Sequence, residues 1–123
     1  MVGKSSIVNV LEAGLCASDL RRKVIANNIA NIETPGFRRS AVKFEDMLAE
    51  ALDAPGGASK KDLAELKGEL FQPVNTPLNA KGNDVNIEVE MGELIKTSSR
   101  QKAYLRMLNK VYKQMELAMR DKF

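Results

Sequence analysis

The side chains best able to do chemistry in this sequence are three asparagines within five residues, Asn27, Asn28 and Asn31. Each carboxamide both donates and accepts hydrogen bonds. The same groups compete with the backbone and make asparagine a poor helix former, so its usual role at a helix end is capping. Three amides exceed the needs of one helix end, and we expect at least one of them to bond a neighbouring subunit. The chemistry indicated is therefore recognition through hydrogen bonds.

Catalysis is the least expected activity of this chain. The sequence contains no histidine and a single cysteine, Cys16, and its carboxylates are not clustered. The acid–base, nucleophilic and metal-binding groups of common active sites cannot be assembled from such a set. One cysteine excludes an internal disulfide, and Cys16 is interpreted as a small, buried or half-buried apolar residue of a helix. We expect no cofactor, no metal and no small-molecule ligand.

A sharp turn follows the asparagines. Ile29 and Ile32 continue a helical apolar spacing up to this point. Thr34 precedes a proline and is therefore kept out of helical backbone. Pro35 suits the first central position of a β-turn, and Gly36 tolerates the positive φ of the second, which predicts a type II turn. The stretch is thus an amide-rich helix end closed by a forced turn.

Two long helices, one at each end of the chain, are predicted to position this turn. The first begins with Ser5 or Ser6 as its N-cap and is roughly 28 residues, or about 42 Å, long. The second covers residues 86–121 with Asn86 as its N-cap, and it has acidic residues early and basic residues late, as the helix dipole favours. Seams with alternating spacings of four and three residues follow both helices: Leu11, Leu15, Ser18, Arg22, Ile25, Ile29 and Ile32, and then Ile87, Met91, Leu94, Ser98, Gln101, Leu105, Leu108, Tyr112, Met115 and Met119.

Both seams are polar in the middle, at Ser18 and Arg22 in the first helix and at Ser98 and Gln101 in the second. These positions fall opposite each other in an antiparallel hairpin, where polar seam residues set register and partner choice at a cost in stability. The expected fold class is mainly α, an antiparallel coiled-coil-like hairpin with a partly extended or flexible middle segment. One buried stripe per helix, at about 25 cal/mol per Å², is marginal for a monomer. We therefore expect other copies to cover the remaining faces and the helices to order fully only on assembly.

The middle of the chain is expected to be less structured than its ends. Residues 37–44 are predicted to be extended, residues 45–52 to form a short helix, and residues 62–71 to form a second short helical piece. Prolines and glycines limit what residues 53–84 can bury, and we expect them to be mobile in an isolated monomer. The chain is predicted to be one domain in three parts, 1–36, 37–84 and 85–123.

Charge and hydropathy weigh against two other classes of protein. The net charge of +3 is too small to indicate nucleic acid binding, and adjacent Arg38 and Arg39 are expected to be solvated or to pair with another subunit. The chain has no apolar run of about 18 residues that could span a membrane, and we expect no cleaved secretory signal. An amphipathic protein at a membrane surface is the alternative, although acidic residues occur along both helices and argue against it.

Residues 26–37, Ala-Asn-Asn-Ile-Ala-Asn-Ile-Glu-Thr-Pro-Gly-Phe, closely resemble the N-terminal signature of bacterial flagellar rod and hook proteins. Tyrosine usually follows the Pro-Gly pair in that group, so Phe37 keeps the ring and lacks the hydroxyl. Residues 81–91 resemble the start of the last helix in the FlgB family of proximal rod proteins. The related FlgC family, which is the nearest alternative, usually carries an Ala-x-Arg-Ala-Tyr-Glu stretch that residues 97–104 do not fit. The resemblance covers both ends of the chain but not residues 53–80.

The resemblance implies a structural subunit that polymerises helically into the rod, the drive shaft that carries torque from motor to hook and filament and is required for motility. It implies export through the flagellar type III apparatus without a cleaved signal, and a place in the periplasmic rod of the basal body. Implied partners are further copies of the chain, the rod proteins FlgC, FlgF and FlgG, the rod-base adaptor FliE, and the export gate with its membrane ring, with no nucleic acid. The residues expected at subunit interfaces come from the two motifs and the second seam: Asn27, Asn28, Ile29, Asn31, Thr34, Pro35, Gly36, Phe37, Gly82, Asn83, Val85, Glu90, Met91, Leu94, Leu105, Leu108, Tyr112 and Met115.

Overall fold

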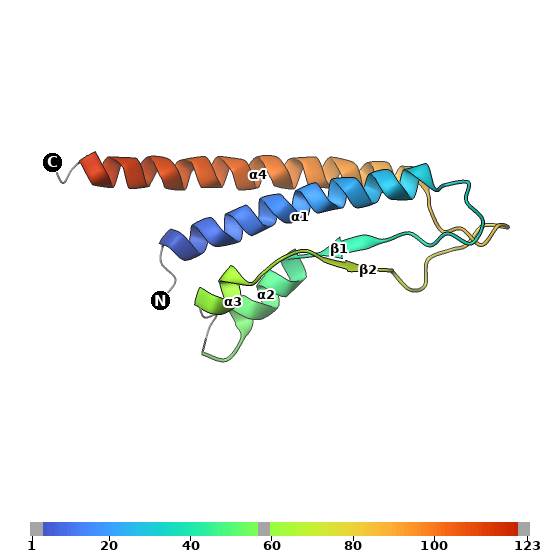
Figure 1. Ribbon diagram of the computed structural model, residues 1–123, viewed down its shortest axis with the longest axis horizontal. Coiled ribbons are helices and arrows are strands. Elements are labelled where there is room, and N and C mark those ends of the chain that lie inside the picture. Colours follow the sequence, from blue (N-terminus) through green and yellow to red (C-terminus); the bar gives the residue numbers. More distant parts are fainter. Residues whose placement is uncertain (1–3, 57–59, 121–123) are drawn as a thin grey trace.

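The computed structural model describes residues 4–56 and 60–120. Two long helices dominate it, and a small layer of short elements packs against one of them (Figure 1). The elements in chain order are α1 (Lys4–Ala30), β1 (Ala41–Lys43), α2 (Glu45–Asp53), α3 (Lys60–Ala64), β2 (Glu69–Phe71) and α4 (Ile87–Arg120).

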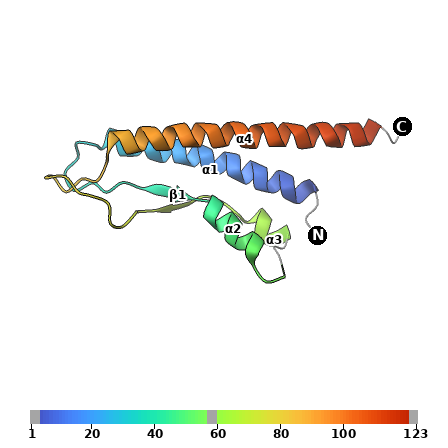
Figure 2. The ribbon, with the colours of Figure 1, turned by 180° about the vertical axis from the view of Figure 1, so that it is seen from behind.

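Helix α1 is the central layer of the molecule. It contacts α4 on one side and β1 and α3 on the other. Both ribbon views show α1 and α4 side by side and running in opposite directions, with the short elements on the far side of α1 (Figures 1 and 2). The prediction of a mainly helical fold with two long packed terminal helices is therefore confirmed.

Of the two predicted helix N-caps, only the one of the second long helix is confirmed. The side-chain oxygen of Asn86 accepts a 2.9 Å hydrogen bond from the backbone N–H of Glu88, as an N-cap of α4 should. The N-cap prediction at Ser5 or Ser6 is wrong, because α1 already begins at Lys4 and both serines lie inside it. Residue 121, the predicted end of the second helix, lies outside the described residues.

The seams that the helices bury differ from the predicted ones. Positions spaced by three and four residues are indeed buried or half-buried, but on a neighbouring track that shares only some positions with the prediction: Leu11, Gly14, Ser18, Arg21, Ile25 and Asn28 in α1, and Glu90, Leu94, Thr97, Gln101, Tyr104, Leu108 and Val111 in α4. Arg22 is exposed, and six members of the predicted second seam are at least about one-third exposed: Ile87, Met91, Leu105, Tyr112, Met115 and Met119.

A glycine explains part of this choice of face. A Cβ on Gly14 would lie 2.8 Å from ring carbons of Tyr104, so only glycine allows the tyrosine ring to lie against the α1 backbone. Ser18 donates to the carbonyl of Gly14 at 3.0 Å and is fully buried without a partner on α4. The close contact therefore brings a polar and small-residue track of α1 against α4 and leaves the apolar track of α4 outside.

The layer formed by the short helices and strands differs from the predictions for the middle of the chain. Strands β1 and β2 pair antiparallel with Val42 opposite Leu70, so the helix predicted for residues 62–71 ends at Ala64 and residues 69–71 form a strand instead. Leu63 and Asn83 are each 1% exposed and Asp84 is 6% exposed, so the prediction that residues 53–84 bury little is wrong at these three positions. Within the described ranges, no helix is both long and apolar enough to span a bilayer.

Candidate functional site

The turn after α1 is held by the loop that precedes α4. The backbone N–H of Phe37 donates to the carbonyl of Thr34 at 3.3 Å, and Gly36 has a φ of 75°, which confirms the type II turn. The N–H of Gly36 donates to the carbonyl of Lys81 at 2.8 Å. Gly82 also has a positive φ, 74°, and a Cβ there would lie 3.8 Å from the Cα of Gly36. We call this junction, residues 26–40 with 76–90, the elbow.

Asn83 caps the end of α1 from the opposite loop. Its side chain is 1% exposed, and its amide donates to the carbonyls of Asn31 at 2.8 Å and Thr34 at 2.9 Å. Its side-chain oxygen accepts the N–H of Val85 at 2.8 Å. Both carbonyls lie in the turn after α1 and also accept backbone N–H groups, from Thr34 and Phe37 respectively. One asparagine thus ties two carbonyls of the turn to its own loop.

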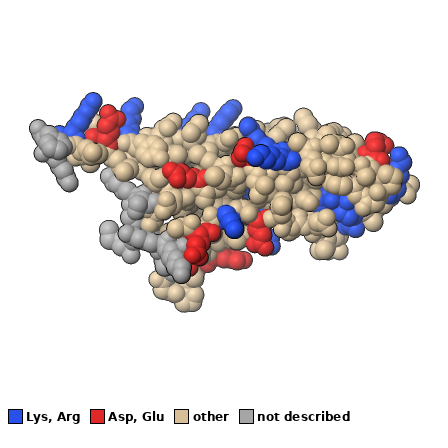
Figure 3. Space-filling view, in the orientation of Figure 1, with Lys and Arg blue, Asp and Glu red and all other residues tan. Residues whose placement is uncertain are grey.

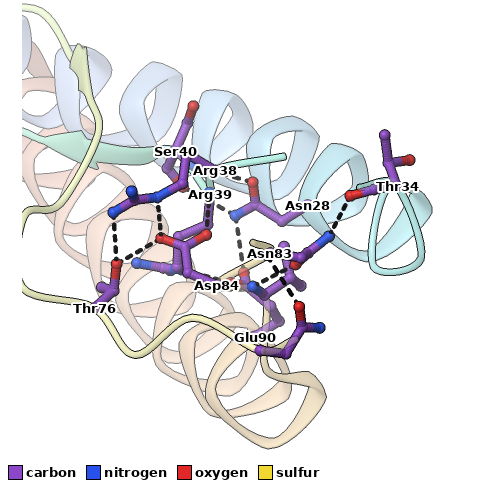
Figure 4. Close-up of polar contacts among 11 residues, drawn as sticks. Asn28, Thr34, Arg38, Arg39, Ser40, Thr76, Asn83, Asp84 and Glu90 are labelled. Atoms are coloured by element: carbon purple, nitrogen blue, oxygen red, sulfur yellow. Dashed lines mark hydrogen bonds and ion pairs between the residues drawn. The ribbon is translucent and has the colours of Figure 1, made fainter. Parts of the chain in front are cut away.

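Asn28 lies at the centre of the elbow and is completely buried (Figure 4). Its amide donates to the carbonyl of Ser40 at 2.9 Å and to a carboxylate oxygen of Glu90 at 3.0 Å. Its side-chain oxygen accepts the N–H of Ser40 at 3.0 Å. Asn28 therefore pairs with the Ser40 backbone as a neighbouring strand would, and it links α1 to α4 at the same time.

Glu90 and Arg39 form a buried ion pair beside Asn28. Glu90 is fully buried, and its second carboxylate oxygen accepts the guanidinium Nε of Arg39 at 2.6 Å. The Arg39 side chain is 12% exposed. Removing one partner of such a pair leaves an uncompensated charge buried in the protein, which lowers the free energy of unfolding by several kcal/mol. The pair therefore ties the segment after the turn to the first turn of α4.

Asp84 completes the elbow with a third set of polar contacts. It accepts the backbone N–H of Arg39, the Thr76 hydroxyl at 2.6 Å and the Arg38 Nε at 3.3 Å (Figure 4). Burial alone would raise the pKa of Asp84, but the hydrogen bonds from Thr76 and Arg39 and the guanidinium of Arg38 outweigh it. They hold this pKa below its ordinary value of 3.8. Asp84 is therefore a charged anchor for two other segments, the one after the turn at Arg38 and Arg39 and the one at Thr76.

A second polar cluster fixes the start of α2 against both long helices. Arg21 donates two hydrogen bonds, of 2.7 and 2.6 Å, to the carboxylate of Glu45, and Tyr104 donates to the same group at 3.2 Å. The Tyr104 ring meets the edge of Phe44 at 6.5 Å between centroids. Burial alone would raise the pKa of Glu45, but the bonds and charge of Arg21 hold it below its ordinary value of 4.5. The cluster joins α1, α2 and α4.

The elbow brings together most of the residues predicted from the first motif, but among them only Asn28 is fully buried. Asn28 bonds only groups of its own chain, so it does not face a neighbour; Asn27 is exposed and Asn31 is half-buried, and a contact with a neighbour stays a prediction for these two. The prediction that Arg38 and Arg39 are solvated or pair with another subunit is wrong in this chain, since both bond carboxylates of the elbow. Cys16 is exposed, so the prediction of a buried or half-buried thiol is wrong.

The predicted interface residues divide into two groups. Some are buried or half-buried within the chain: Asn28, Ile29, Asn31, Phe37, Gly82, Asn83, Val85, Glu90, Leu94 and Leu108. The others are exposed and free to meet a partner: Asn27, Thr34, Pro35, Gly36, Met91, Leu105, Tyr112 and Met115. The role of either group in binding other subunits remains a prediction.

Exposed apolar residues of α4 form a stripe along the helix that is interrupted by the half-buried Ser98. Five of its positions are spaced by seven residues, which places them on one face of a helix in a coiled-coil arrangement. We call this set, with two neighbours, the outer stripe: Ile87, Met91, Ser98, Leu105, Tyr112, Met115 and Met119. Large exposed apolar patches mark surfaces that bind other molecules.

Sequence reasoning missed the charged partners of the elbow and of the second cluster. Arg39, Thr76 and Asp84 meet only because the turn and the loop before α4 are bonded to each other. Arg21 and Glu45 lie 24 positions apart in the chain. A local pattern carries no signal for such pairs. The one available signal was Arg21, the single charged residue on the buried track of α1.

Comparison with known proteins gives matches among flagellar axial proteins. A family model described as "Flagella basal body rod protein" matches residues 9–38, which cover most of α1 and the turn. The flagellar basal body rod protein FlgB of Bacillus subtilis is 28% identical over 111 residues, 85% of this chain and 86% of that protein. FlgB of Borreliella burgdorferi is 34% identical over 91 residues, 62% of this chain and 67% of that protein. FlgG of Buchnera aphidicola (subsp. Baizongia pistaciae) is 34% identical over 92 residues, but this chain spans only 33% of its length.

Proposed function

This chain belongs to the family of flagellar basal-body rod proteins, and on that premise we propose that it is a structural subunit of the proximal rod. It would polymerise helically, together with other rod proteins, into the shaft that carries torque from motor to hook and filament. Its relatives are structural rod proteins and not enzymes. The greater coverage of FlgB than of FlgG supports a place in the FlgB group.

The observation that carries this proposal is the outer stripe of α4. Leu105 is 48% exposed, Met91 46% and Met119 65%, although each belongs to one regular heptad track. In a single chain, α4 packs against α1 through its polar track, where Glu90 bonds Asn28 of α1 and Tyr104 also lies. The apolar outer stripe of α4 is left uncovered. Apolar area removed from water contributes about 25 cal/mol per Å², so covering the stripe favours assembly. A helical tube of copies would cover it along its length.

We test the proposal with one substitution on the outer stripe and one beside it. Leu105→Asp places a charge on the stripe, and we expect it to abolish rod assembly and swimming in a strain that lacks the native gene. Ser99→Asp places the same charge at another exposed position of α4 and should leave swimming intact. Both variant monomers should unfold at similar denaturant concentrations, because neither site is buried. Normal swimming of the gene deletion, or of Leu105→Asp, would refute the proposal.

The expected partners and location follow from the same premise. We propose contacts with further copies, with FlgC, FlgF and FlgG, and with the rod-base adaptor FliE, after passage through the type III export gate and its membrane ring into the periplasmic rod. Pull-down from cross-linked basal bodies with a tagged chain should recover these proteins. Recovery of none of them, from a preparation that contains the rod, would contradict this assignment.

A membrane surface is the second candidate partner, because basic residues flank the outer stripe. Lys102, Arg106 and Lys113 are all exposed on α4, and basic amphipathic helices bind anionic lipid surfaces. Flotation with anionic liposomes tests this class. We expect the chain to stay in the bottom fraction, since acidic residues also lie on both helices. Flotation that the Leu105→Asp variant loses would favour the membrane role over the rod.

A further inference from the structure

A track of basic side chains lies on the side of α4 that faces away from α1. At 3.6 residues per turn, its members fall within about a quarter of the helix circumference, roughly opposite the buried side chains of Thr97 and Leu108. Residues 102–113 contain no acidic residue, and no member of the track forms an ion pair with a described residue. Like charges three or four residues apart destabilise a helix, so these charges are uncompensated within the chain. We call this exposed set the basic track: Lys102, Arg106, Lys110 and Lys113.

A matching acidic track lies on the side of α2 that faces away from α1. It consists of Asp46, Glu50 and Asp53, which are all exposed and form no ion pair in the described part of the chain. They lie roughly opposite Leu48 and Leu52, which face apolar side chains of α1. Asp53 is also the last residue of α2, where the helix dipole disfavours a negative charge. The acidic track therefore also lacks compensation within the chain.

A hollow of about 510 Å³ adjoins the acidic track, between α2 and the two strands. Asp46 and Glu50 line it together with Glu69 of β2, and Lys43 is the only basic residue among the described residues of its lining. The Lys43 ammonium lies 5.2 Å from the centre of the Phe71 ring, in a cation–π contact. The hollow is thus acidic on balance, and it gives long basic side chains room to enter.

The two tracks lie on opposite outer faces of the molecule. Helix α4 forms one outer layer and α2 belongs to the other, with α1 between them (Figure 1). The space-filling view shows Lys and Arg projecting from the edge along α4, while Asp and Glu gather over α2 (Figure 3). The tracks therefore cannot meet within one chain, but they can meet between two copies.

The spacing of the charges also matches. Arg106, Lys110 and Lys113 are separated by four and then three residues, and so are the three members of the acidic track. Helices α2 and α4 both lead away from the elbow (Figures 1 and 2). Copies stacked in similar orientations therefore place α4 of one copy alongside α2 of the next in the same direction. In that arrangement the equal spacing lets three ion pairs form in register.

We propose that the basic track of one copy docks on the acidic track of the next copy, with Lys110 opposite Glu50. This contact rests on the proposed function, since it joins two rod subunits. The two surfaces differ, so the contact is head-to-tail and repeats with every added copy, as helical assembly requires. Exposed ion pairs contribute little affinity each, so the contact sets the register and orientation of neighbours. The outer stripe lies on a different side of α4 and stays available for another neighbour.

Cross-linking in assembled basal bodies tests the register. A chain with Cys16→Ser, Glu50→Cys and Lys110→Cys has one thiol on each outer face, so the two thiols of one chain cannot reach each other. A short bifunctional thiol reagent should link this chain into a ladder of dimers and larger products on a denaturing gel. In the control, Ser99→Cys replaces Lys110→Cys; it lies on the same side of α4 but roughly 16 Å away along the helix, and it should give no ladder. Absence of the ladder, or an equal ladder from the control, would overturn the proposal.

Charge reversal tests which molecule faces the basic track. Lys110→Glu and Glu50→Lys should each lower the yield of assembled rods about three- to tenfold, and the double variant should return to within about twofold of the native chain. Lys23→Glu makes the same change of net charge at an exposed position of α1 and should change the yield less than about twofold. All three sites are exposed, so the variant monomers should unfold at similar urea concentrations. Single variants without effect, or without rescue by the double variant, would contradict docking on a second copy.

Lipid binding and the proposed function are tested separately. Flotation with phosphatidylserine-containing vesicles that Lys110→Glu abolishes and the double variant does not restore would assign the basic track to a membrane and overturn the contact between copies. Basal bodies that contain the chain but give no ladder would refute this contact alone. Basal bodies of the native strain that lack the chain would refute the proposed function itself.

Discussion

Asn28→Ala should remove the most consequential hydrogen bonds of the elbow. The substitution leaves the N–H and the carbonyl of Ser40 and one carboxylate oxygen of Glu90 without their present partner. A buried group left unpaired costs about 1–3 kcal/mol, and more when it is charged. Ser40 is half-buried and water replaces part of its loss, whereas Glu90 is fully buried. We therefore expect the free energy of unfolding to fall by about 3–5 kcal/mol, a large share of the stability of a small domain.

Asn27→Ala is the matched control for this substitution. Asn27 lies in the same helix but is exposed, and its side chain accepts only an exposed 3.3 Å bond from Asn31. Both substitutions gain the same helix propensity, so their difference isolates the buried contacts. Urea unfolding followed by far-ultraviolet circular dichroism should show the midpoint of Asn28→Ala about 2–3 M below that of Asn27→Ala, for an m-value of about 1.5 kcal/mol/M. Stabilities that agree within about 0.5 kcal/mol would refute the assignment of Asn28 to the core of the elbow.

Three further predictions concern the turn, the charged clusters and the helix contact. Gly36→Val forces a β-branched residue to a φ of 75° and should lower the free energy of unfolding by about 1–3 kcal/mol. It should also abolish swimming while export continues. The control Gly92→Ala, which has open space around its Cβ, should be neutral or stabilising. Because the pKa values of Glu45 and Asp84 are lowered in the folded chain, their stabilising contribution is complete above their ordinary values of 4.5 and 3.8 and is lost as the pH falls further; a free energy of unfolding that stays constant from neutral pH to pH about 3 would contradict this. Gly14→Ala places a Cβ 2.8 Å from an aromatic ring of α4 and should lower the free energy of unfolding by about 1–3 kcal/mol in the same urea assay, and an unchanged midpoint would contradict the close helix contact.

The expectation that the helices order fully only on assembly has its own measurement. Every residue from 112 to 120 is exposed, so circular dichroism of the dilute monomer should show less helix than the assembled rod. Loss of helix should be confined to this end of α4, because Glu90 and Asn28 anchor the other end. Hydrogen exchange resolved along α4 distinguishes the two ends, and uniform slow exchange over the whole helix would contradict the expectation.

Local rules explain why the turn and the long helices could be predicted. Pro35 and Gly36 restrict their own φ values, and Asn86 caps the helix that follows it, whatever the rest of the chain does. The resemblance of residues 26–37 to rod and hook proteins depends on the same local motif. The extended stretch at residues 69–71 could not be predicted in this way, because an apolar spacing that suits a short helix also suits a strand once β1 offers it a partner.

The sequence by itself determined the two helical segments, the type II turn between them and the family to which the chain is related, because backbone restriction and apolar period are properties of neighbouring residues. Only the tertiary structure decided which track of each helix is buried. Tracks that share the same alternating spacing lie side by side on one helix, so periodicity alone cannot choose between them. The contact of Gly14 with Tyr104 and the buried bond of Asn28 to Glu90 selected the polar track. That choice leaves the apolar outer stripe of α4 exposed and free to meet other subunits.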